Sequence, residues 1–332
     1  MTLAPRRFDT ATEPYRRELL THCYRMLGSI HDAEDLVQET YLRAWKGFDR
    51  FEGRSSVRTW LYRIATTACL TALETRARRP LPSGLGAPST EPLWQPAADE
   101  EIAWLQPAPD SALGGPVNPR DPADIAVYRA GVRLAFIAAL QQLPARQRAV
   151  LVLCDVLQFR PAEAADILDT STKAIYSALL RARTKVGAGR LDPDDVTEPE
   201  DPDQQTILDR YVDAFVHLDV AGLAALLRAD VELEMPPTPT WFRGREAVIA
   251  FLSAQVLRNP EQWRLLPTWG NGQPAIGVFA RHSDGGYRAH GVHVLETSGG
   301  LIARVVAFNE AALVPTFGLP ARLRPDDRVE GS

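Results

Sequence analysis

Apolar residues recur at helical spacing in three stretches near the start of the chain. One is residues 13–28, which ends at Gly28, a residue type that commonly follows the last turn of a helix. The other two follow Asp32 and Ser56, which are suitable helix N-caps. Their apolar stripes are Ala33, Leu36, Val37, Tyr41, Ala44 and Trp45, and then Val57, Trp60, Leu61, Ile64 and Ala68. The pattern predicts a small helical bundle.

A second set of helical patterns occupies residues 126–187. The runs VRLAFIAALQQL and ARQRAVLVLCDVL predict two helices, with Pro144 at the start of the second. The short run RPAEAADIL, a turn at residues 169–171 and the run TKAIYSALLRARTKV then predict a helix-turn-helix. The inward positions of its last helix are Ile175, Leu179, Ala182 and Val186.

The pattern changes again from Thr206. The run TILDRYVDAFVHLDVAGLAALL predicts two helices and WFRGREAVIAFLSAQV a third. The runs AIGVFARH, YRAHGVHVLE and IARVVAF predict strands separated by SDGG and SGG turns. The predicted fold class is therefore multidomain, with two all-α helical domains and a C-terminal α+β cone.

Two connecting stretches lack this periodicity. Residues 81–126 are rich in Pro, Gly and Ala and predict a linker, while residues 191–205 hold seven acids and no base and predict a solvated hinge. The expected boundaries are 1–80 and 127–190 for the helical domains, 81–126 and 191–205 for the acidic connectors, 206–320 for the cone, and 321–332 for a tail.

The net charge of −5 hides an uneven distribution. Residues 1–80 hold 14 Lys and Arg against 10 Asp and Glu, and residues 127–190 hold 10 against 4, so these modules carry +4 and +6. The acidic excess lies elsewhere in the chain. Two basic modules joined by acidic connectors are suited to contact with phosphates.

Cysteine usage and hydropathy limit the class of protein. Cys23, Cys69 and Cys154 are far apart within apolar helical patterns, which favours reduced core thiols over a metal site. No apolar run approaches the roughly 20 residues that span a bilayer. The start, MTLAPRRFDT, lacks the apolar region of an export signal. We expect a cytoplasmic protein with no membrane partner, no metal and no cofactor.

The run DAEDLVQETYLRAW followed by FDRFEGRSSVRTWLYRIA resembles region 2 of the extracytoplasmic-function (ECF) sigma factors, which belong to the sigma-70 family of bacteria. The resemblance implies that this part binds core RNA polymerase and opens the promoter. The polar pair Gln38 and Glu39 matches the pair that grips the clamp helices of the largest polymerase subunit. The residues assigned to core-polymerase binding are Asp35, Gln38 and Glu39.

The same resemblance assigns the loop at residues 48–56 to capture of a base flipped from the minus-ten element. Flipping costs about a few kcal/mol, which an aromatic pocket recovers by stacking. The outer face of the next helix mixes guanidinium, hydroxyl and phenol groups, suited to phosphates and base edges. Thr67 and Thr71 stand where many relatives carry Asn and Asp, which leaves the preferred minus-ten sequence open. The residues assigned to minus-ten DNA are Phe48, Phe51, Arg54, Arg58, Tyr62, Arg63, Thr66 and Thr67.

The run ALQQLPARQRAVLVLCDVL followed by AEAADIL resembles sigma region 4, which recognises the minus-thirty-five element. The outward face of the last helix offers a hydroxyl and a guanidinium to base edges, a leucine to a thymine methyl, and cations to phosphates. Asp169 stands at the usual glycine of the turn. The residues assigned to minus-thirty-five DNA are Lys173, Tyr176, Ser177, Leu180, Arg181 and Arg183.

The runs WFRGREAVIAFL, NGQPA and FGLP resemble SnoaL-like domains, which share a fold with ketosteroid isomerases and nuclear transport factor two. This version is the one fused to sigma factors of the SigJ and SigG kind, and WLQPAPD at residues 104–110 resembles a linker feature of that subgroup. A cone of this kind can hold a small ligand. Strand alternation over residues 287–295 leaves open which histidine faces the cavity. The candidate pocket residues are Asp213, His217, Trp241, His290 and His293.

These observations predict an alternative sigma factor that is not an enzyme. Its expected partners are core RNA polymerase and promoter DNA, and its cone is expected to act in cis by docking on the basic modules or to hold a small ligand. Two other interpretations stay open. One is a helix-turn-helix regulator that acts independently of polymerase. The other is an isomerase-type or hydrolase-type enzyme in which the cone is fused to a sigma module.

Overall fold

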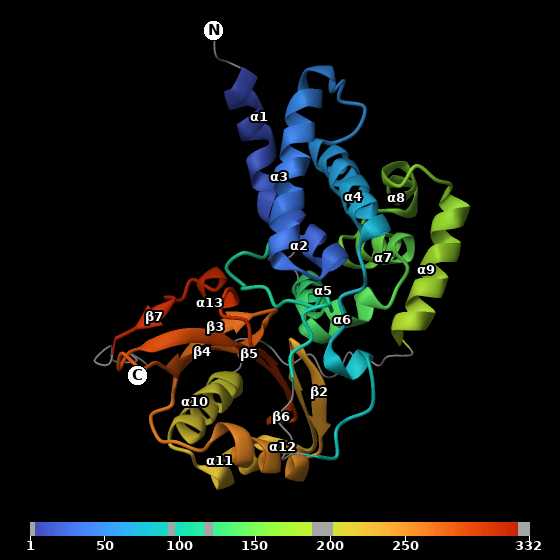
Figure 1. The fold of residues 1–332 in the computed structure, drawn as a ribbon. Coiled ribbons are helices and arrows are strands. Elements are labelled where there is room, and N and C mark those ends of the chain that lie inside the picture. The colour runs from blue at the N-terminus through green and yellow to red at the C-terminus, as the bar shows by residue number, and fades with distance from the viewer. Residues whose placement is uncertain (1–3, 92–96, 116–121, 188–201, 325–332) are drawn as a thin grey trace. The chain divides into compact units, whose positions relative to one another are not determined.

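The structure is a computed structural model that describes residues 4–91, 97–115, 122–187 and 202–324 (Figure 1). The chain divides into two compact units. The helical unit comprises Met1–Arg79 with Ala112–Asp192, and the cone unit comprises Pro80–Ser111 with Pro193–Ser332. The predicted linker is thus divided, because residues 80–111 pack with the C-terminal domain. Across the described residues, no helix is both long and apolar enough to cross a membrane.

The first part of the helical unit is the predicted bundle, with helices α1 (Ala4–Thr12), α2 (Arg16–Leu27), α3 (Ile30–Gly47) and α4 (Val57–Thr75). Gly28 ends α2 in the left-handed conformation, with φ of 68°. Ser56 caps α4 as predicted. The predicted cap at Asp32 is wrong: α3 begins at Ile30, and the Ser29 hydroxyl accepts a hydrogen bond from Asp32 N at 3.2 Å. Since Gly28 has already turned the chain, Ser29 is the first extended residue and can cap the helix.

The second part of the helical unit carries the helix-turn-helix. Its helices are α5 (Pro122–Val132), α6 (Leu134–Gln141), α7 (Ala145–Leu151), α8 (Pro161–Ile167) and α9 (Thr172–Gly187), with a π-helical turn at Val152–Val156. Asp169 takes a left-handed φ of 48° in the turn before α9. Ile175, Leu179 and Ala182 are buried, as predicted, and they direct the other side of α9 to solvent.

Two buried arginines join the two parts of the helical unit. Arg25 in α2 donates from Nε to Gly131 O at 2.9 Å, and Arg148 in α7 donates from Nη1 to Met26 O. Burial lowers the pKa of each guanidinium to about 10. Each part therefore contributes one arginine to a backbone carbonyl of the other.

The cone unit is a curved mixed sheet with its three longer helices against one face (Figure 1). The helices are α10 (Pro202–Val216), α11 (Val220–Leu226), α12 (Arg245–Phe251) and α13 (Leu313–Thr316). The strands are β1 (Leu227–Met235), β2 (Thr238–Arg243), β3 (Trp263–Gly270), β4 (Gln273–Arg281), β5 (Tyr287–Ser298), β6 (Leu301–Phe308) and β7 (Arg322–Leu323). The strand order is β2-β1-β6-β5-β4-β3, with β7 on β5, and among the described strands only β1 and β6 pair in parallel. The core between sheet and helices includes Leu208, Tyr211, Phe215, Phe242, Phe251, Ile276 and Leu295.

Strands β1, β2, β3 and β7 were not expected from the sequence. Strand β1 follows α11 without a loop, and its charged residues mask the alternation, while β3 contains Pro267, a residue type that argues against a strand. The third helix was predicted to start at Trp241, but Trp241 to Arg243 belong to β2 and α12 begins at Arg245. Gly244 separates them with a φ of 93°, a conformation that only glycine adopts readily.

Candidate functional site

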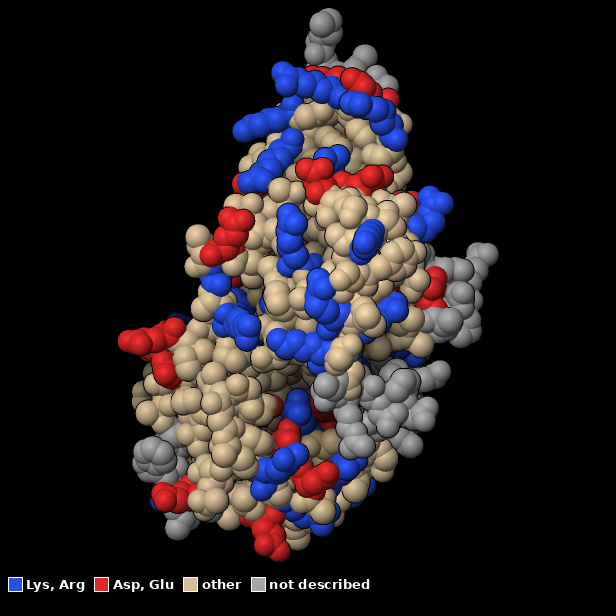
Figure 2. All heavy atoms as spheres, turned by 90° about the vertical axis from the view of Figure 1, so that its right-hand side faces the viewer, with Lys and Arg blue, Asp and Glu red and all other residues tan. Residues whose placement is uncertain are grey.

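One side of α9 exposes most of the side chains assigned to the minus-thirty-five element. Tyr176 and Leu180 are 59% and 69% exposed, although both are large and apolar. Ser177 Oγ accepts a hydrogen bond of 2.6 Å from Arg181 Nη1, so the serine orients the guanidinium. Lys173 is exposed near the start of the same helix. Figure 2, which faces α8 and α9, shows Lys and Arg side chains gathered over the helical unit.

Arg183 is placed differently from the other five. Its guanidinium makes two hydrogen bonds to the carboxylate of Asp155, at 2.6 and 2.9 Å, and so faces the π-helical turn. In this arrangement Arg183 positions α9 against the rest of the helix-turn-helix rather than standing free for phosphate. Local spacing does not indicate this pair, because 28 residues separate Asp155 and Arg183.

The loop between α3 and α4 is held by an aromatic cluster. Phe48 packs edge-on against Phe8 with ring centroids 5.3 Å apart, and Phe51 lies 4.9 Å from the Trp60 ring. Both phenylalanines are only partly buried. A groove of about 750 Å³ adjoins this loop. Among its lining residues are Phe51, Arg54 and Arg63, together with Asp166 and Asp169 from the helix-turn-helix.

The assigned residues of α4 divide into two sets. Arg63 and Thr67 are exposed, whereas Tyr62 and Thr66 are fully buried and face the interior of the helical unit. Thr66 Oγ1 lies 2.9 Å from Nε2 of His22, a residue on α2. Contact between Thr66 and DNA is therefore not available in this arrangement.

Tyr62 is covered by Phe159, whose ring centroid lies 5.1 Å away. Arg58 lies against both rings, with Cζ 5.0 Å from the Tyr62 centroid and 4.7 Å from that of Phe159. Its guanidinium also binds Glu18 at 3.0 Å. Arg58 and Tyr62 can meet DNA only if Phe159 moves away.

The residues that the sequence assigns to polymerase binding lie on the outer side of α3. Asp35 and Gln38 are exposed, and Glu39 forms a 2.6 Å ion pair with Arg43. Leu42 continues this side one turn later and is 62% exposed. Trp45, predicted as core, is instead 43% exposed, although it packs against Phe8 at 5.3 Å. Neither of these two side chains was predicted from the sequence to be exposed. For Leu42 the signal was its position one helical turn after the polar Gln38, whereas Trp45 followed the spacing of the apolar stripe.

Comparisons with known proteins agree with this arrangement. Family models match at residues 12–79 for Sigma-70 region 2, 133–186 for Sigma-70 region 4 and 208–305 for the SnoaL-like domain. ECF RNA polymerase sigma factor SigG of Mycobacterium tuberculosis is 48% identical over 318 residues, which are 95% of this chain and 85% of that protein. The chain belongs to the ECF RNA polymerase sigma factors.

A second relative supports the same conclusion for this sigma factor. SigJ of Mycobacterium tuberculosis is 28% identical over 253 residues, covering 74% of this chain and 72% of SigJ. The crystal structure of SigJ shares the fold, with a TM-score of 0.59 at 23% identity, over 94% of this chain and 99% of that one. The predicted family, fold class and alternative sigma factor function are confirmed, and the chain is a transcription factor rather than an enzyme.

The candidate pocket residues of the cone do not converge. Asp213 on α10 and His217, which directly follows this helix, are exposed and pair with each other at 3.0 Å. Trp241 donates from its indole nitrogen to Gly86 O at 2.9 Å, so it contacts the linker, while the neighbouring Phe242 is in the core. The five residues therefore do not line one common pocket.

The two histidines of β5 have different surroundings. His290 is the extra residue of a bulge, because Gly291 and Ala289 pair with consecutive residues of β4. His293 is buried with its ring 6.3 Å from Phe215 of α10, which places it on the core side of the sheet. Burial lowers the pKa of His293 to about 3, so its imidazole is neutral. The bulge explains why simple alternation could not assign the two side chains.

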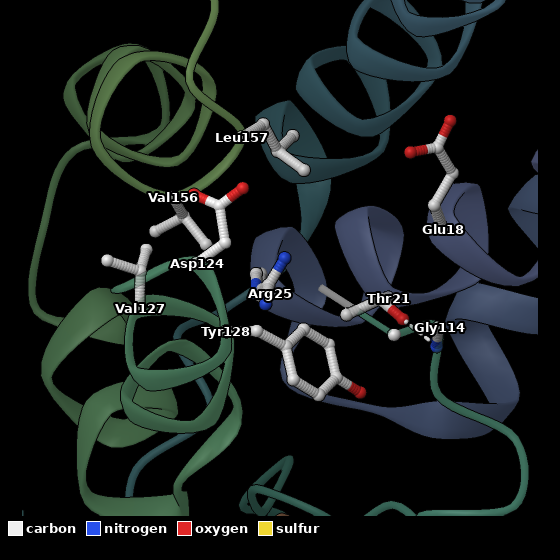
Figure 3. Close-up of a pocket in the computed structure, with 10 residues that line it drawn as sticks. Glu18, Thr21, Arg25, Gly114, Asp124, Val127, Tyr128, Val156 and Leu157 are labelled. Carbon is white, nitrogen blue, oxygen red and sulfur yellow. Dashed lines mark hydrogen bonds between the residues drawn. The ribbon is translucent and has the colours of Figure 1, made fainter. Parts of the chain in front are cut away.

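A small cavity in the helical unit surrounds Arg25 (Figure 3). Its walls include Thr21, Asp124 and Tyr128. The cavity volume is about 20 Å³, which is room for one water molecule. It is too small for an organic ligand.

The burial of His22 predicts acid sensitivity of region 2. Burial lowers its pKa to about 3 from the ordinary 6.5, so between these values the unfolded chain binds a proton that the folded chain does not. The free energy of unfolding should fall by about 1.4 kcal/mol per pH unit as pH decreases through this window. Hydrogen exchange of α2 and α4 amides, compared at pH 7 and pH 5, measures the effect.

The variant His22→Gln should weaken this pH dependence in α2 and α4. The matched control is His293→Gln, since its histidine is also neutral and buried but belongs to the cone. That control should change the pH dependence of β5 alone. An unchanged response of α2 and α4 in His22→Gln would show that other groups control the acid sensitivity.

Proposed function

We propose that this sigma factor joins core RNA polymerase through α3 and directs it to promoters whose minus-ten element meets region 2 and whose minus-thirty-five element meets α9. The observation that carries the proposal is the exposed side of α9. There, Tyr176, Leu180 and the linked pair Ser177 and Arg181 lie together on a module of net charge +6. Because transcription by bacterial polymerase takes place in the cytoplasm, we assign the protein to that compartment.

The polymerase contact rests on the outer side of α3. Gln38 and Glu39 supply hydrogen-bonding groups, and the exposed Leu42 and Trp45 supply apolar area on the same helix. An apolar centre with a polar rim is the usual composition of a protein interface. For region 2, the exposed Arg54, Arg63 and Thr67 are the groups that can meet the minus-ten element without rearrangement.

We also propose that the C-terminal domain modulates promoter activity in cis. The support is that residues 80–111, which belong to the connection between regions 2 and 4, pack with that domain. A domain that holds this connection influences both promoter-binding modules without touching DNA. A small ligand of the cone is not part of the proposal, because the pocket candidates do not converge.

Transcription in vitro with core polymerase and a genomic promoter library tests both proposals. The full chain should produce defined start sites, and deletion of residues 206–332 should change their number or strength. Absence of any start site, together with failure to bind core polymerase, would remove the first proposal. Identical transcription and polymerase affinity with and without the domain would remove the second.

The guanidinium of Arg181 should contribute specificity rather than general affinity. Arg181→Ala should cost about 1 to 3 kcal/mol at one base pair of the minus-thirty-five element if the guanidinium binds a guanine. Lys173→Ala is the control, since loss of a phosphate contact weakens binding on all sequences alike. The affinity of each variant for a set of minus-thirty-five elements that differ by single bases measures both effects. An equal loss on every sequence for Arg181→Ala would reduce its role to phosphate contact.

A further inference from the structure

The linker is bonded to the cone at two places, and the first involves β1 and β2. Ser83 N donates to Oε2 of Glu234 at 2.8 Å. The Trp241 indole donates to Gly86 O at 2.9 Å, and Trp241 O accepts from Ser89 N at 2.7 Å. These bonds attach the start of the linker to one edge of the sheet.

The second attachment involves the turn between β3 and β4. Asn271 Oδ1 accepts from Ala108 N at 2.9 Å, and Asn271 N donates to Ala108 O at 3.0 Å. The Asp110 carboxylate accepts from Gly272 N at 2.8 Å. The approach is so close that a Cβ on Gly270 would lie 3.1 Å from Ala108 O and 2.6 Å from the Phe317 ring. The WLQPAPD, NGQPA and FGLP runs thus meet at one point.

A hydrogen bond of 3.2 Å from Leu105 N to Pro80 O joins the two ends of the attached segment. It closes a loop, so residues 81–104 add no length to the path between regions 2 and 4. We use the name clasp for this bond together with the contacts of Glu234, Trp241 and Asn271.

The clasp roughly halves the maximum distance that the linker can span between regions 2 and 4. Helix α4 ends at Thr75 and α5 begins at Pro122, so 46 residues connect them, and the closed loop leaves 22 of these in the path. At about 3.3 Å per residue, the maximum span falls from roughly 150 Å to roughly 70 Å. Promoter elements roughly 17 base pairs apart are separated by about 60 Å, at about 3.4 Å per base pair. The closed linker must be almost straight to reach that far.

We propose that the clasp determines which promoter spacings this sigma factor serves. With the clasp closed, added base pairs between the elements draw a nearly extended chain tighter, so long spacers are excluded. With the clasp open, the linker has slack and longer spacers become accessible. This inference rests on the proposed sigma function and specifies how the cone acts in cis.

The contacts of the clasp are suited to opening. Glu234 has no exposed surface, and Nε of Arg304 lies 3.6 Å from its Oε1. Burial raises the pKa of the Glu234 carboxyl. Release of the linker returns this carboxylate to water, which offsets part of the hydrogen bonding that is lost.

Two substitutions open the clasp from different ends. Asn271→Ala removes the carbonyl that holds Ala108 N, and Trp241→Phe removes the indole donor to Gly86 O but keeps an aromatic ring. The matched control is Trp263→Phe, because its indole donates to Val256 O within the cone at 3.0 Å. Hydrogen exchange should report faster exchange at Leu105 and Ala108 in both clasp variants, with the β4 and β5 amides unchanged.

Transcription by reconstituted holoenzyme is then measured on one promoter whose spacer is lengthened one base pair at a time. Wild type and Trp263→Phe should lose activity steeply with each added base pair of about 3.4 Å. Both clasp variants should retain at least about threefold more activity on the longest spacers, because their linkers are slack. Their activity at the best spacing should equal that of wild type.

Opening of the clasp with an unchanged spacing profile would overturn the inference, as would unchanged exchange at Leu105 and Ala108 in both variants. A uniform loss at all spacings would also overturn it, since that outcome assigns the contacts to stability alone. Absence of transcription by every form at every spacing is distinguishable from these results, because it contradicts the proposed sigma function itself.

Discussion

Two DNA-binding modules on one chain can act together only when the segment between them spans the distance between their sites. In this protein the hydrogen bond from Leu105 N to Pro80 O controls that distance, because it removes residues 81–104 from the connecting path. The free linker exceeds the separation of promoter elements more than twofold, whereas the closed linker only just reaches it. A single backbone contact, supported by side chains of the cone, thus converts a slack tether into a taut one.

The contacts between regions 2 and 4 are similarly suited to separation. Arg25 and Arg148 cross between them to backbone carbonyls, and neither guanidinium meets a carboxylate there. Arg25 Nη2 and Arg148 Nε lack hydrogen-bond partners among the described residues. Buried charges of this kind cost desolvation energy that carbonyl contacts only partly return. Separation of the two regions rehydrates both arginines and also uncovers Tyr62, which Phe159 covers.

Local patterns predicted the helical parts well, because helix faces and caps depend on neighbouring residues. The inward side of α9 and the cap at Ser56 followed directly from spacing. Contacts distant in sequence could not be predicted in this way. Arg183 has a suitable position for phosphate, yet Asp155 binds it from 28 residues away. Likewise, the composition of residues 81–126 indicated a linker, while the acceptors that hold its backbone belong to Glu234 and Asn271 far along the chain.

The cone illustrates how a fold associated with ligands can serve another purpose. Its interior is filled by Tyr211, Phe215 and Phe251, and its one buried histidine there, His293, has no acid beside it among the described residues. The groups capable of strong hydrogen bonds, Glu234 and Asn271, instead hold linker backbone. Backbone amides of the linker are satisfied by these side chains only while the linker is in place, so the side chains stabilise one conformation of the chain rather than a substrate. The polar chemistry of the domain is thus directed to the geometry of the linker.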